Sequence, residues 1–286
     1  MTVYFNSGAT GTYFGNPTGS SLSFNTGRAP LNWPLVYREL DTSTAAVVNA
    51  ASIRPSTQRQ VDMDNLVRDL KAASIWNSLD LFYVLANETS QLALLNWKAP
   101  STFAGTATNA PTFTQDRGYT GNGSNAFIAT GWNFSINGVK YTQNSAMLGG
   151  WNLTALPNNV ALLGSSVNAA NVVVPRGGSG TQFRLRVNNT APIETGNVSD
   201  ASGLSVAVRT DASTIASYKN GTLFGTPQAA ASEALTNDTL TILRGLNTYF
   251  NGQAASAFVG ANITAAQQLS LFTALQTYLR ATGAVT

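Results

Sequence analysis

The chain has 286 residues, of which 16 are basic and 13 acidic, so its formal net charge is +3 at pH 7. It contains neither cysteine nor histidine, which excludes disulfides, thiolate or imidazole metal ligands, and a Ser-His-Asp triad. Only 10% of the residues are charged, and the basic ones never cluster beyond pairs such as Arg184 and Arg186, so we expect no nucleic-acid partner.

The N-terminal residues Met1-Thr-Val-Tyr-Phe5 lack the basic and apolar regions of a signal peptide, and we expect none. No apolar run approaches the ~18 residues of a transmembrane helix, so we expect no membrane insertion. A chain of this length has room for one large core or two small ones.

The first predicted segment, residues 1–50, differs in composition from the rest. Residues 6–27 are rich in Gly, Ser, Thr and Asn, and two prolines within residues 28–37 force an extended path. Such a segment buries too little apolar area to fold alone. It is either a disordered leader or, as we favour, an extended N-terminal arm for anchoring and assembly. The aromatic residues that would dock the arm on a neighbouring subunit are Tyr4, Phe5, Tyr13, Phe14, Phe24 and Trp33.

The second predicted segment, residues 51–80, contains a helix that starts at Pro55-Ser56, with Ser56 as its N-cap. Asp64 and Arg68 form an i,i+4 pair in the favourable order. We expect an amphipathic helix that covers a sheet and turns its charges to solvent. The apolar positions near helical spacing are Val61, Leu66, Leu70 and Ala73.

The third predicted segment, residues 81–286, is dominated by short β-type runs. Residues 183–187 alternate apolar and charged side chains, as a sheet with one wet face requires. Asn220-Gly221 is a strong hairpin signal. Many short strands separated by turns predict a β-sandwich. The predicted strands are residues 81–86, 146–151, 160–163, 183–187, 204–208, 239–243 and 257–259.

A closing helix is predicted near the C-terminus. It begins with the capping box Thr264-Ala-Ala-Gln267, and Gly283 supplies its stop. Its periodic residues are Leu269, Phe272, Leu275, Gln276 and Leu279.

The stretch Pro111–Trp132 reads as two short strands joined by a Gly-Asn-Gly turn at residues 121–123. The side chains able to face a core are those of Phe113, Tyr119, Phe127 and Ile128.

This stretch resembles the second and third strands of a laminin-G-like, concanavalin A-like jelly roll. The order of helix, jelly roll and closing helix resembles a group of phage and prophage tail-associated proteins. Residues 1–50 fall outside the resemblance, which fits an arm particular to one kind of particle. It implies a mainly β fold, a concanavalin A-like antiparallel β-sandwich (jelly roll) with an N-terminal arm, a preceding helix and a C-terminal helix. Further matching stretches are residues 66–76, 79–86, 93–98, 140–146, 218–221 and 257–261.

The resemblance implies a structural protein of a bacteriophage-like virion surface, in a tail fibre, tail tip or head fibre. Its lectin-like domain would contact the host surface or a glycan. Its partners would be other virion proteins, copies of itself (a trimer, by analogy with fibre proteins) and host surface polysaccharide. It would be made in the host cytoplasm, which agrees with the missing cysteines. The alternatives are a capsid decoration or assembly protein without glycan binding, and a polysaccharide depolymerase.

Some relatives of this sandwich are glycoside hydrolases, in which the catalytic motif looks like Glu-x-Asp-x-x-Glu or Glu-x-Asp-x-Glu on one strand. That spacing places alternate carboxylates on one face of the sheet. This sequence has no such string, so we predict no enzymatic activity and no catalytic residue. Asp116, Asn122, Asn125 and Asp200 are candidate calcium ligands. Asp116 and Asn122 fit ordinary turns better, and no metal or cofactor is predicted.

Carbohydrate binding needs an aromatic platform surrounded by amides or hydroxyls. The residues that offer these groups are Trp132, Trp151, Tyr119, Asn133, Asn152 and Arg176, the last beside an exposed Gly-rich loop. The alternative is that Trp132 and Trp151 belong to the sandwich core, as we expect for Trp76 and Trp97.

Overall fold

Two units make up the chain, Met1–Leu40 and Asp41–Thr286. The computed structural model describes residues 2–4, 10–12, 39–155, 159–168, 170–177 and 181–286. In the first unit, β1 (Thr2–Tyr4) pairs antiparallel with β2 (Thr10–Thr12). The side chains of all six predicted arm contacts, that of Tyr4 included, lie outside the described residues.

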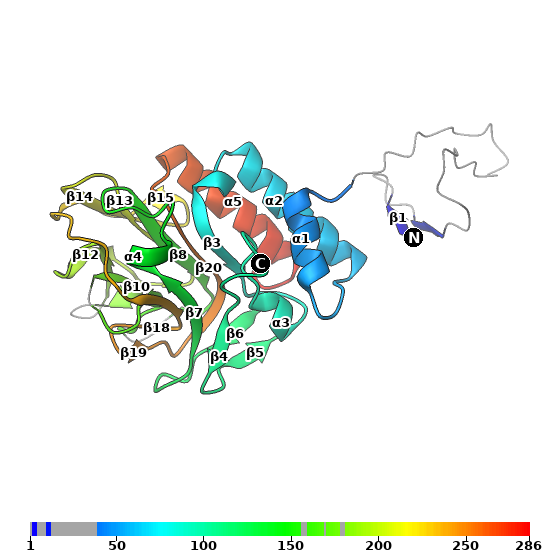
Figure 1. Ribbon diagram of the computed structural model, residues 1–286, viewed down its shortest axis with the longest axis horizontal. Helices are drawn as coiled ribbons and strands as arrows, with labels where there is room; N and C mark the ends of the chain where they lie inside the picture. The colour runs from blue at the N-terminus through cyan, green and yellow to red at the C-terminus, as the bar shows by residue number, and fades with distance from the viewer. Residues whose placement is uncertain (1, 5–9, 13–38, 156–158, 169, 178–180) are drawn as a thin grey trace. The chain divides into compact units, whose positions relative to one another are not determined.

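The second unit contains two antiparallel sheets and a layer of helices (Figure 1). The seven-stranded sheet has the order β12 (Ile193–Asn197), β11 (Gln182–Val187), β10 (Asn171–Gly177), β9 (Leu163–Ser165), β17 (Thr239–Ile242), β7 (Phe127–Asn133) and β4 (Thr106–Thr108). A hairpin of β18 (Arg244–Gly245) and β19 (Thr248–Tyr249) follows β17 along the chain.

The nine-stranded sheet has the order β15 (Thr222–Leu223), β14 (Thr214–Lys219), β13 (Gly203–Arg209), β8 (Ala146–Asn152), β20 (Gln253–Gly260), β6 (Gly118–Thr120) and β5 (Thr112–Thr114). In addition, β16 (Gln228–Ala229) pairs with β14, and β3 (Leu79–Val84) pairs with β20. Every pairing among the described strands is antiparallel.

The helices are few and lie mainly outside the sandwich. They are α1 (Thr42–Ala50), α2 (Thr57–Ala72), a 3-10 turn (Trp76–Ser78), α3 (Ser90–Ala93), α4 (Phe134–Asn137) and α5 (Ala265–Ala281). The predicted mainly β sandwich with a preceding and a closing helix is therefore confirmed. None of the helices in the described part of the chain is both long and apolar enough to cross a bilayer.

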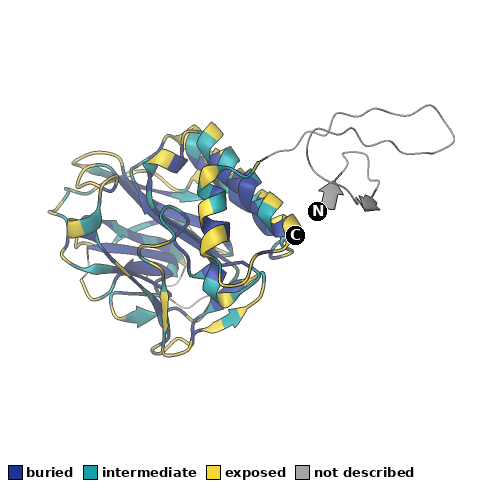
Figure 2. Ribbon diagram, turned by 45° about the vertical axis from the view of Figure 1, so that its right-hand side comes forward, coloured by how far each residue is buried: buried dark blue, intermediate teal, exposed yellow. Residues whose placement is uncertain are grey.

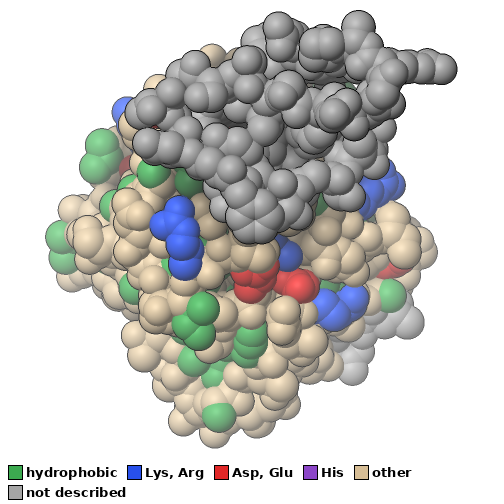
Figure 3. Space-filling view, turned by 90° about the vertical axis from the view of Figure 1, so that its right-hand side faces the viewer, with side chains coloured by type: hydrophobic (Ala, Val, Ile, Leu, Met, Phe, Trp, Pro, Cys, Tyr) green, Lys and Arg blue, Asp and Glu red, His purple; other side chains and the backbone are tan. Residues whose placement is uncertain are grey.

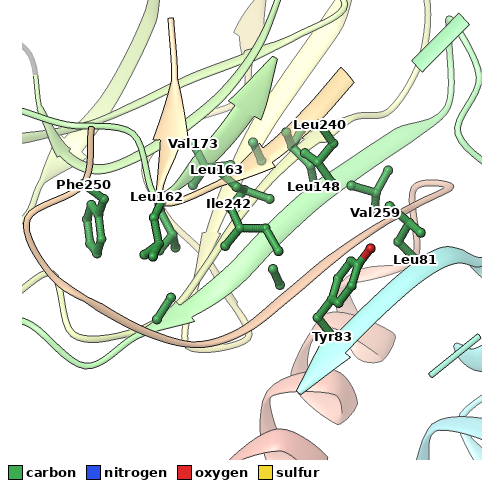
Figure 4. Packing of buried hydrophobic residues seen from close by; sticks show 14 of the residues in the cluster. Leu81, Tyr83, Leu148, Leu162, Leu163, Val173, Leu240, Ile242, Phe250 and Val259 are labelled. Carbon is green, nitrogen blue, oxygen red and sulfur yellow. The ribbon is translucent and has the colours of Figure 1, made fainter. Parts of the chain in front are cut away.

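The main core lies between the two sheets. Alternate side chains of each strand point inward, among them Leu148 and Val259 of the nine-stranded sheet and Val173 and Ile242 of the seven-stranded one (Figure 4). All four are 0% exposed, and burying each such side chain contributes about 1.5–3 kcal/mol. This burial fixes the register, because a one-residue slip would turn these side chains to the opposite face.

A second apolar layer joins the nine-stranded sheet to α2 and α5, whose inward sides are buried and whose outward sides are exposed (Figure 2). Trp76, Phe82, Trp97 and Tyr278 form a chain of edge-to-face aromatic contacts with ring centroids 5.9–6.1 Å apart. Trp76 and Trp97 are buried, which confirms their prediction as core residues. The helices start as predicted, with Ser56 capping α2 and the Thr264 capping box on α5.

The boundary predicted at residue 50 needs correction. Residues 42–50 form α1 and belong to the second unit, which begins at Asp41. The Asp41 carboxylate accepts a hydrogen bond from the Ser43 amide (2.8 Å) and pairs with Lys71 of α2 (2.6 Å). Both contacts fix the start of α1, and a composition argument based on residues 6–37 could not reveal them.

The prediction that the charges of α2 face solvent is also wrong in part, because Arg59 and Asp64 are buried. The Arg59 guanidinium contacts Asp116 (2.8 Å), the Tyr278 hydroxyl (3.3 Å) and the Asn87 amide oxygen (3.4 Å). The Asp64 carboxylate accepts hydrogen bonds from the Asp41 amide and from the Arg68 guanidinium, each at 2.6 Å. These ion pairs and hydrogen bonds compensate the cost of burying the two charges.

The Gly-Asn-Gly segment is not the turn of a hairpin, which corrects the prediction for residues 111–132. The hairpin there joins β5 to β6, whereas residues 121–126 carry the chain from β6 in one sheet to β7 in the other. The Asn122 side chain accepts hydrogen bonds from three successive backbone amides, those of Ser124, Asn125 and Ala126 (2.9–3.0 Å). This network supports a crossover between sheets that local sequence cannot distinguish from a tight turn.

Candidate functional site

A groove of about 460 Å³ lies where the C-terminal half of α5 meets the ends of β8 and β13. Its lining comes from five separate parts of the chain: the β5–β6 turn, the end of β8, the start of β13, the β14–β15 turn, and α5 with the residues that follow it. The lining side chains with aromatic, amide or charged groups are Arg117, Trp151, Asn152, Asn220, Phe272 and Gln276.

The aromatic part of the groove is a parallel stack. The rings of Trp151 and Phe272 lie 5.5 Å apart between centroids, with 3° between their planes. Trp151 stands on the outer face of β8, toward α5, because its neighbours Leu148 and Gly150 face the inter-sheet core. The Trp151 indole is almost fully buried and Phe272 is half-buried, so Phe272 is the more accessible ring of the pair.

Amide groups surround this stack, and some are already committed to the fold. The Asn152 amide donates to the carbonyl oxygens of Thr154 (2.7 Å) and Ala201 (3.1 Å), so it orders the groove wall. The side-chain oxygen of Asn220 accepts a hydrogen bond from the backbone amide of Leu204 (2.9 Å). Gln276 is half-buried on α5, one turn after Phe272.

The charged side chain of the groove is Arg117, which is exposed. Its Nε donates to the Gln253 amide oxygen (3.2 Å), and one terminal nitrogen donates to the Ala284 carbonyl (3.3 Å). These bonds hold the guanidinium at the groove edge and leave part of it open to solvent. The groove thus combines an aromatic pair, neutral amides and one arginine.

The half-buried side chain of Lys219 supports the wall beside β13. The Lys219 Nζ donates to the carbonyl oxygens of Ala201 (2.7 Å) and Ser202, directly behind the groove residues Ser202 and Gly203. Burial lowers the pKa of Lys219 to about 8, against the opposing effect of the Asp200 carboxylate. The half-buried Lys98, over the ring of Trp76, also has its pKa lowered to about 8, by burial and by the charge of Lys71.

We expect the free energy of unfolding to rise with pH between 8 and about 9.5. In that window the unfolded chain keeps the proton that the folded Lys219 has released, so raising the pH favours the folded state. The rise should be about 1 kcal/mol from each of Lys98 and Lys219. Urea unfolding at several pH values measures it. Lys219→Met should remove about half of the rise, and Arg280→Met, which removes an exposed cation, should keep it; an equal rise in the two variants contradicts the assignment.

Of the six predicted contact residues, the structure brings Trp151 and Asn152 together in the groove. Trp132 and Tyr119 are corrected, because both belong to the core between the sheets and neither lines the groove. Trp132 packs edge-on against Phe134 and Tyr141.

Asn133 and Arg176 lie away from the groove. Asn133 caps α4 by accepting hydrogen bonds from the amides of Ser135 and Ile136, and its own amide donates to Asn237 (2.8 Å). Arg176 belongs to β10, beside a β-bulge, and is half-buried rather than part of an exposed loop.

Among the six aromatic, amide or charged side chains of the groove, four lie outside the sequence prediction, namely Arg117, Asn220, Phe272 and Gln276. Phe272 and Gln276 are separated by four residues on a helix, which is a signal for a shared face, yet that spacing alone does not distinguish a groove from a core. Asn220 was recognised only as a turn residue, and its φ of 50° confirms that role.

The described residues contain no group of three or more acidic side chains that could hold a metal ion. Asp116 is paired with Arg59, and Asn122 and Asn125 bond to each other at 2.8 Å. Hydrogen bonding from the Ser202 side chain, and from the Ser202 amide at 2.7 Å, lowers the pKa of Asp200. The candidate calcium ligands therefore have local structural partners.

No family model matches the sequence, and no curated protein matches it. Among solved structures, the chain is similar to an HCR/D mutant, with 11% identity and a TM-score of 0.51 over 70% of this chain and 53% of that one. It is also similar to domain 4 of AbnA, a GH43 extracellular arabinanase from Geobacillus stearothermophilus (13% identity, TM-score 0.47, 68% of this chain and 98% of that one). A third is Trypanosoma rangeli sialidase (14% identity, TM-score 0.46, 77% of this chain and 39% of that one). The chain thus spans about half or less of the HCR/D and sialidase chains, and at 11% identity the HCR/D likeness supports the sandwich fold alone.

Proposed function

We propose that this chain is a non-enzymatic structural protein on the surface of a bacteriophage-like particle, in a tail fibre, tail tip or head fibre. Its sandwich contacts a glycan of the host surface through the groove beside α5. The particle assignment is supported by the sequence resemblance to phage and prophage tail-associated proteins, and the glycan contact by the groove.

The observation that carries the glycan contact is the composition of the groove. The half-buried Phe272 ring, stacked on Trp151, offers apolar surface in the groove, and Asn220 and Gln276 offer amides beside it. Sugars present apolar ring faces and hydroxyl edges, which these two kinds of group match.

The same groove favours binding over hydrolysis. Its lining residues, among those described, include no aspartate or glutamate. Glycoside hydrolysis ordinarily needs two carboxyl groups on either side of the scissile bond. A polysaccharide that enters this groove would therefore be held and not cut by that mechanism.

The surface agrees with a role among polar partners. On the face shown in Figure 3, charged and hydrophobic side chains form small separate groups, and most of the described surface around them is uncharged polar or backbone. A surface of this kind suits hydrogen bonding to uncharged hydroxyl groups more than electrostatic steering of a partner.

We expect the full chain to bind neutral oligosaccharides on a glycan array, and Phe272→Ala with Gln276→Ala to weaken that binding about tenfold. The loss corresponds to about 1.4 kcal/mol, the order expected for one aromatic contact with an amide beside it. Titration with the best array sugar measures the change, and urea unfolding shows that the variant is folded.

Thr273→Ala is the matched control. Thr273 lies on α5 between the two altered residues but is exposed and does not line the groove, so the change should leave binding intact. Equal affinities for the double variant and the control would exclude the groove as the glycan site, and no binding to any array sugar would overturn the proposed glycan contact.

A further inference from the structure

The strands of the seven-stranded sheet and the β18–β19 hairpin carry an uneven distribution of charge. They contain four arginines and one carboxylate, Glu194. The other charged residues of the sequence are more evenly balanced, 12 basic against 12 acidic, since the whole chain has 16 and 13. The arginines are Arg176, Arg184, Arg186 and Arg244.

Three of these arginines share the outer face of the sheet, away from the inter-sheet core. Arg184 pairs in register with Val174, and Arg186 with Val172. Both valines belong to a small outer cluster with Ala161, whereas the intervening Val173 lies in the main core. Residues directly opposite in an antiparallel pair point to the same side, so Arg184 and Arg186 point outward.

The β18–β19 hairpin places Arg244 on the same side. A Cβ atom on Gly245 would lie 3.2 Å from the Val172 side chain and 2.9 Å from that of Ala161, and Leu246 packs on this outer cluster. In Figure 1 the hairpin lies at the end of the second unit away from α2 and α5.

Two aromatic rings hold the Arg244 guanidinium. Its central carbon lies 4.9 Å from the ring centroid of Phe127 and 5.3 Å from that of Tyr249. Its terminal nitrogen donates to the Asn247 amide oxygen (2.9 Å), and its Nε is buried with no hydrogen-bond partner. Among the described residues no carboxylate lies within salt-bridge distance of it.

The backbone of this hairpin is strained. Leu243, Leu246 and Asn247 have φ values of 65°, 53° and 56°, in the left-handed region that leucine rarely adopts. For each of the two leucines this conformation costs on the order of 1 kcal/mol or more, whereas asparagine tolerates it, and strained residues cluster at ligand clamps. On this hairpin the Arg244 guanidinium is held by its two ring contacts and its hydrogen bond to Asn247.

Arg184 is also held in place, because its Nε and one terminal nitrogen bond the same Glu194 oxygen at 3.0 and 2.8 Å, and its other terminal nitrogen donates to Asn159 (3.2 Å). Burial lowers the pKa of Arg186, and the positive charge of Arg184 lowers it further. Glu194 balances the charge of Arg184, so Arg186 supplies the net positive charge on this part of the face.

We propose that the outer face of the seven-stranded sheet is a second binding surface, for an acidic polysaccharide, with Arg186 and Arg244 as its anion contacts. Guanidinium forks match carboxylate and sulfate oxygens, and the half-buried rings of Phe127 and Tyr249 offer apolar surface to a sugar ring. Two cations on separate strands, β11 and β18, suit a polymer with widely spaced charges. DNA, with one charge per ~1.7 Å, favours denser basic patches.

The test measures binding of the full chain to heparin, which bears sulfates, and to polygalacturonate, which bears only carboxylates, with dextran as the neutral polymer. We expect binding to at least one acidic polymer, weakening with salt, and none to dextran. Arg186→Gln with Arg244→Gln should weaken binding about tenfold and reduce the slope of log Kd against log salt by about two, one for each lost contact.

Arg54→Gln with Arg280→Gln removes two exposed arginines of the helical side and should change neither quantity. Phe272→Ala should also leave the affinity for acidic polymers and its salt dependence unchanged, which separates this surface from the groove. Three results would overturn the proposal: no binding to either acidic polymer, equal losses in the two double variants, or equally tight binding of a single-stranded oligonucleotide.

Discussion

Arg209→Ala is expected to lower the free energy of unfolding by about 4 kcal/mol, a large effect for one substitution. Arg209 lies on β13 and is 0% exposed. Its Nε donates to the Val187 carbonyl (2.7 Å), and one terminal nitrogen donates to the carbonyls of Ala230 (2.8 Å) and Asp211 (3.2 Å). Alanine would leave these acceptors buried and unpaired, and it would open a cavity the size of the arginine side chain.

Arg209 joins the two sheets, because the carbonyl groups that it bonds belong to strands and turns of both. Val187 ends β11 of one sheet, whereas Asp211 and Ala230 belong to the chain that enters and leaves β14 and β16 of the other. One guanidinium therefore ties both sheets and the segment after β16 together. Burial lowers the pKa of Arg209, partly offset by Tyr141 and by the acidic groups of Asp211 and Glu233. An arginine remains protonated despite such shifts.

Urea unfolding measures this effect, and two variants control it. Arg54→Ala removes an exposed arginine and should cost less than about 0.5 kcal/mol. The second terminal nitrogen of Arg209 donates to the Ala231 carbonyl (3.5 Å), so the guanidinium reaches its acceptors from three nitrogens. Arg209→Lys keeps the charge but offers them one ammonium, so it should cost about 2 kcal/mol. A loss below about 1 kcal/mol for Arg209→Ala would show that water replaces the guanidinium.

The parts of the fold that the sequence predicts are those with a local physical cause. The Ser56 and Thr264 caps, the alternation in residues 183–187 and the Asn220-Gly221 hairpin each depend on neighbouring residues, and the structure contains all four. The sandwich follows from their sum, because strands with one apolar face require a partner sheet.

The sequence predictions are wrong where contacts between residues far apart in the sequence determine the local structure. The Gly-Asn-Gly segment has the composition of a turn, but Gly121 lies against the Phe250 carbonyl, and the chain passes to the other sheet there. Likewise, α1 is fixed by Lys71, 30 positions after Asp41. No pattern within residues 1–50 contains that ion pair.

In the candidate site, too, residue chemistry is predictable from the sequence, whereas the tertiary contacts are not. Trp151 and Asn152 were chosen for their chemistry, and the groove contains both because β8 ends beside α5. Their neighbour Phe272 is 121 positions away in sequence, and its stacking on Trp151 arises from the docking of α5 on the sheet. Trp132 has the same chemistry as Trp151, yet it lies on an inward-facing position of β7 and is buried. Residue type identifies candidates, and tertiary packing chooses among them.

Gly118→Ala is expected to destabilise the protein as strongly as Arg209→Ala, by about 4 kcal/mol. Gly118 begins β6, in the stretch that carries the resemblance to the jelly-roll family, and its φ is +99°. A Cβ atom there would lie 2.1 Å from the Ala254 carbonyl oxygen and 3.2 Å from the Leu85 side chain. The first distance is far inside contact distance, so β6 would have to move away from β20, to which it is paired through Tyr119 and Ala254.

Gly131→Ala separates the two causes of this loss, which are the backbone strain of a positive φ and the steric clash of the added Cβ atom. Gly131, on β7, also has a positive φ of +71°, but a Cβ atom there would have no neighbour within 4 Å. It should therefore cost only the backbone strain, about 1 kcal/mol, and urea unfolding of both variants gives the difference of about 3 kcal/mol that belongs to the clash. Equal losses at the two glycines would mean that β6 moves freely, and the close approach of β6 to β20 would not be what requires a glycine at position 118.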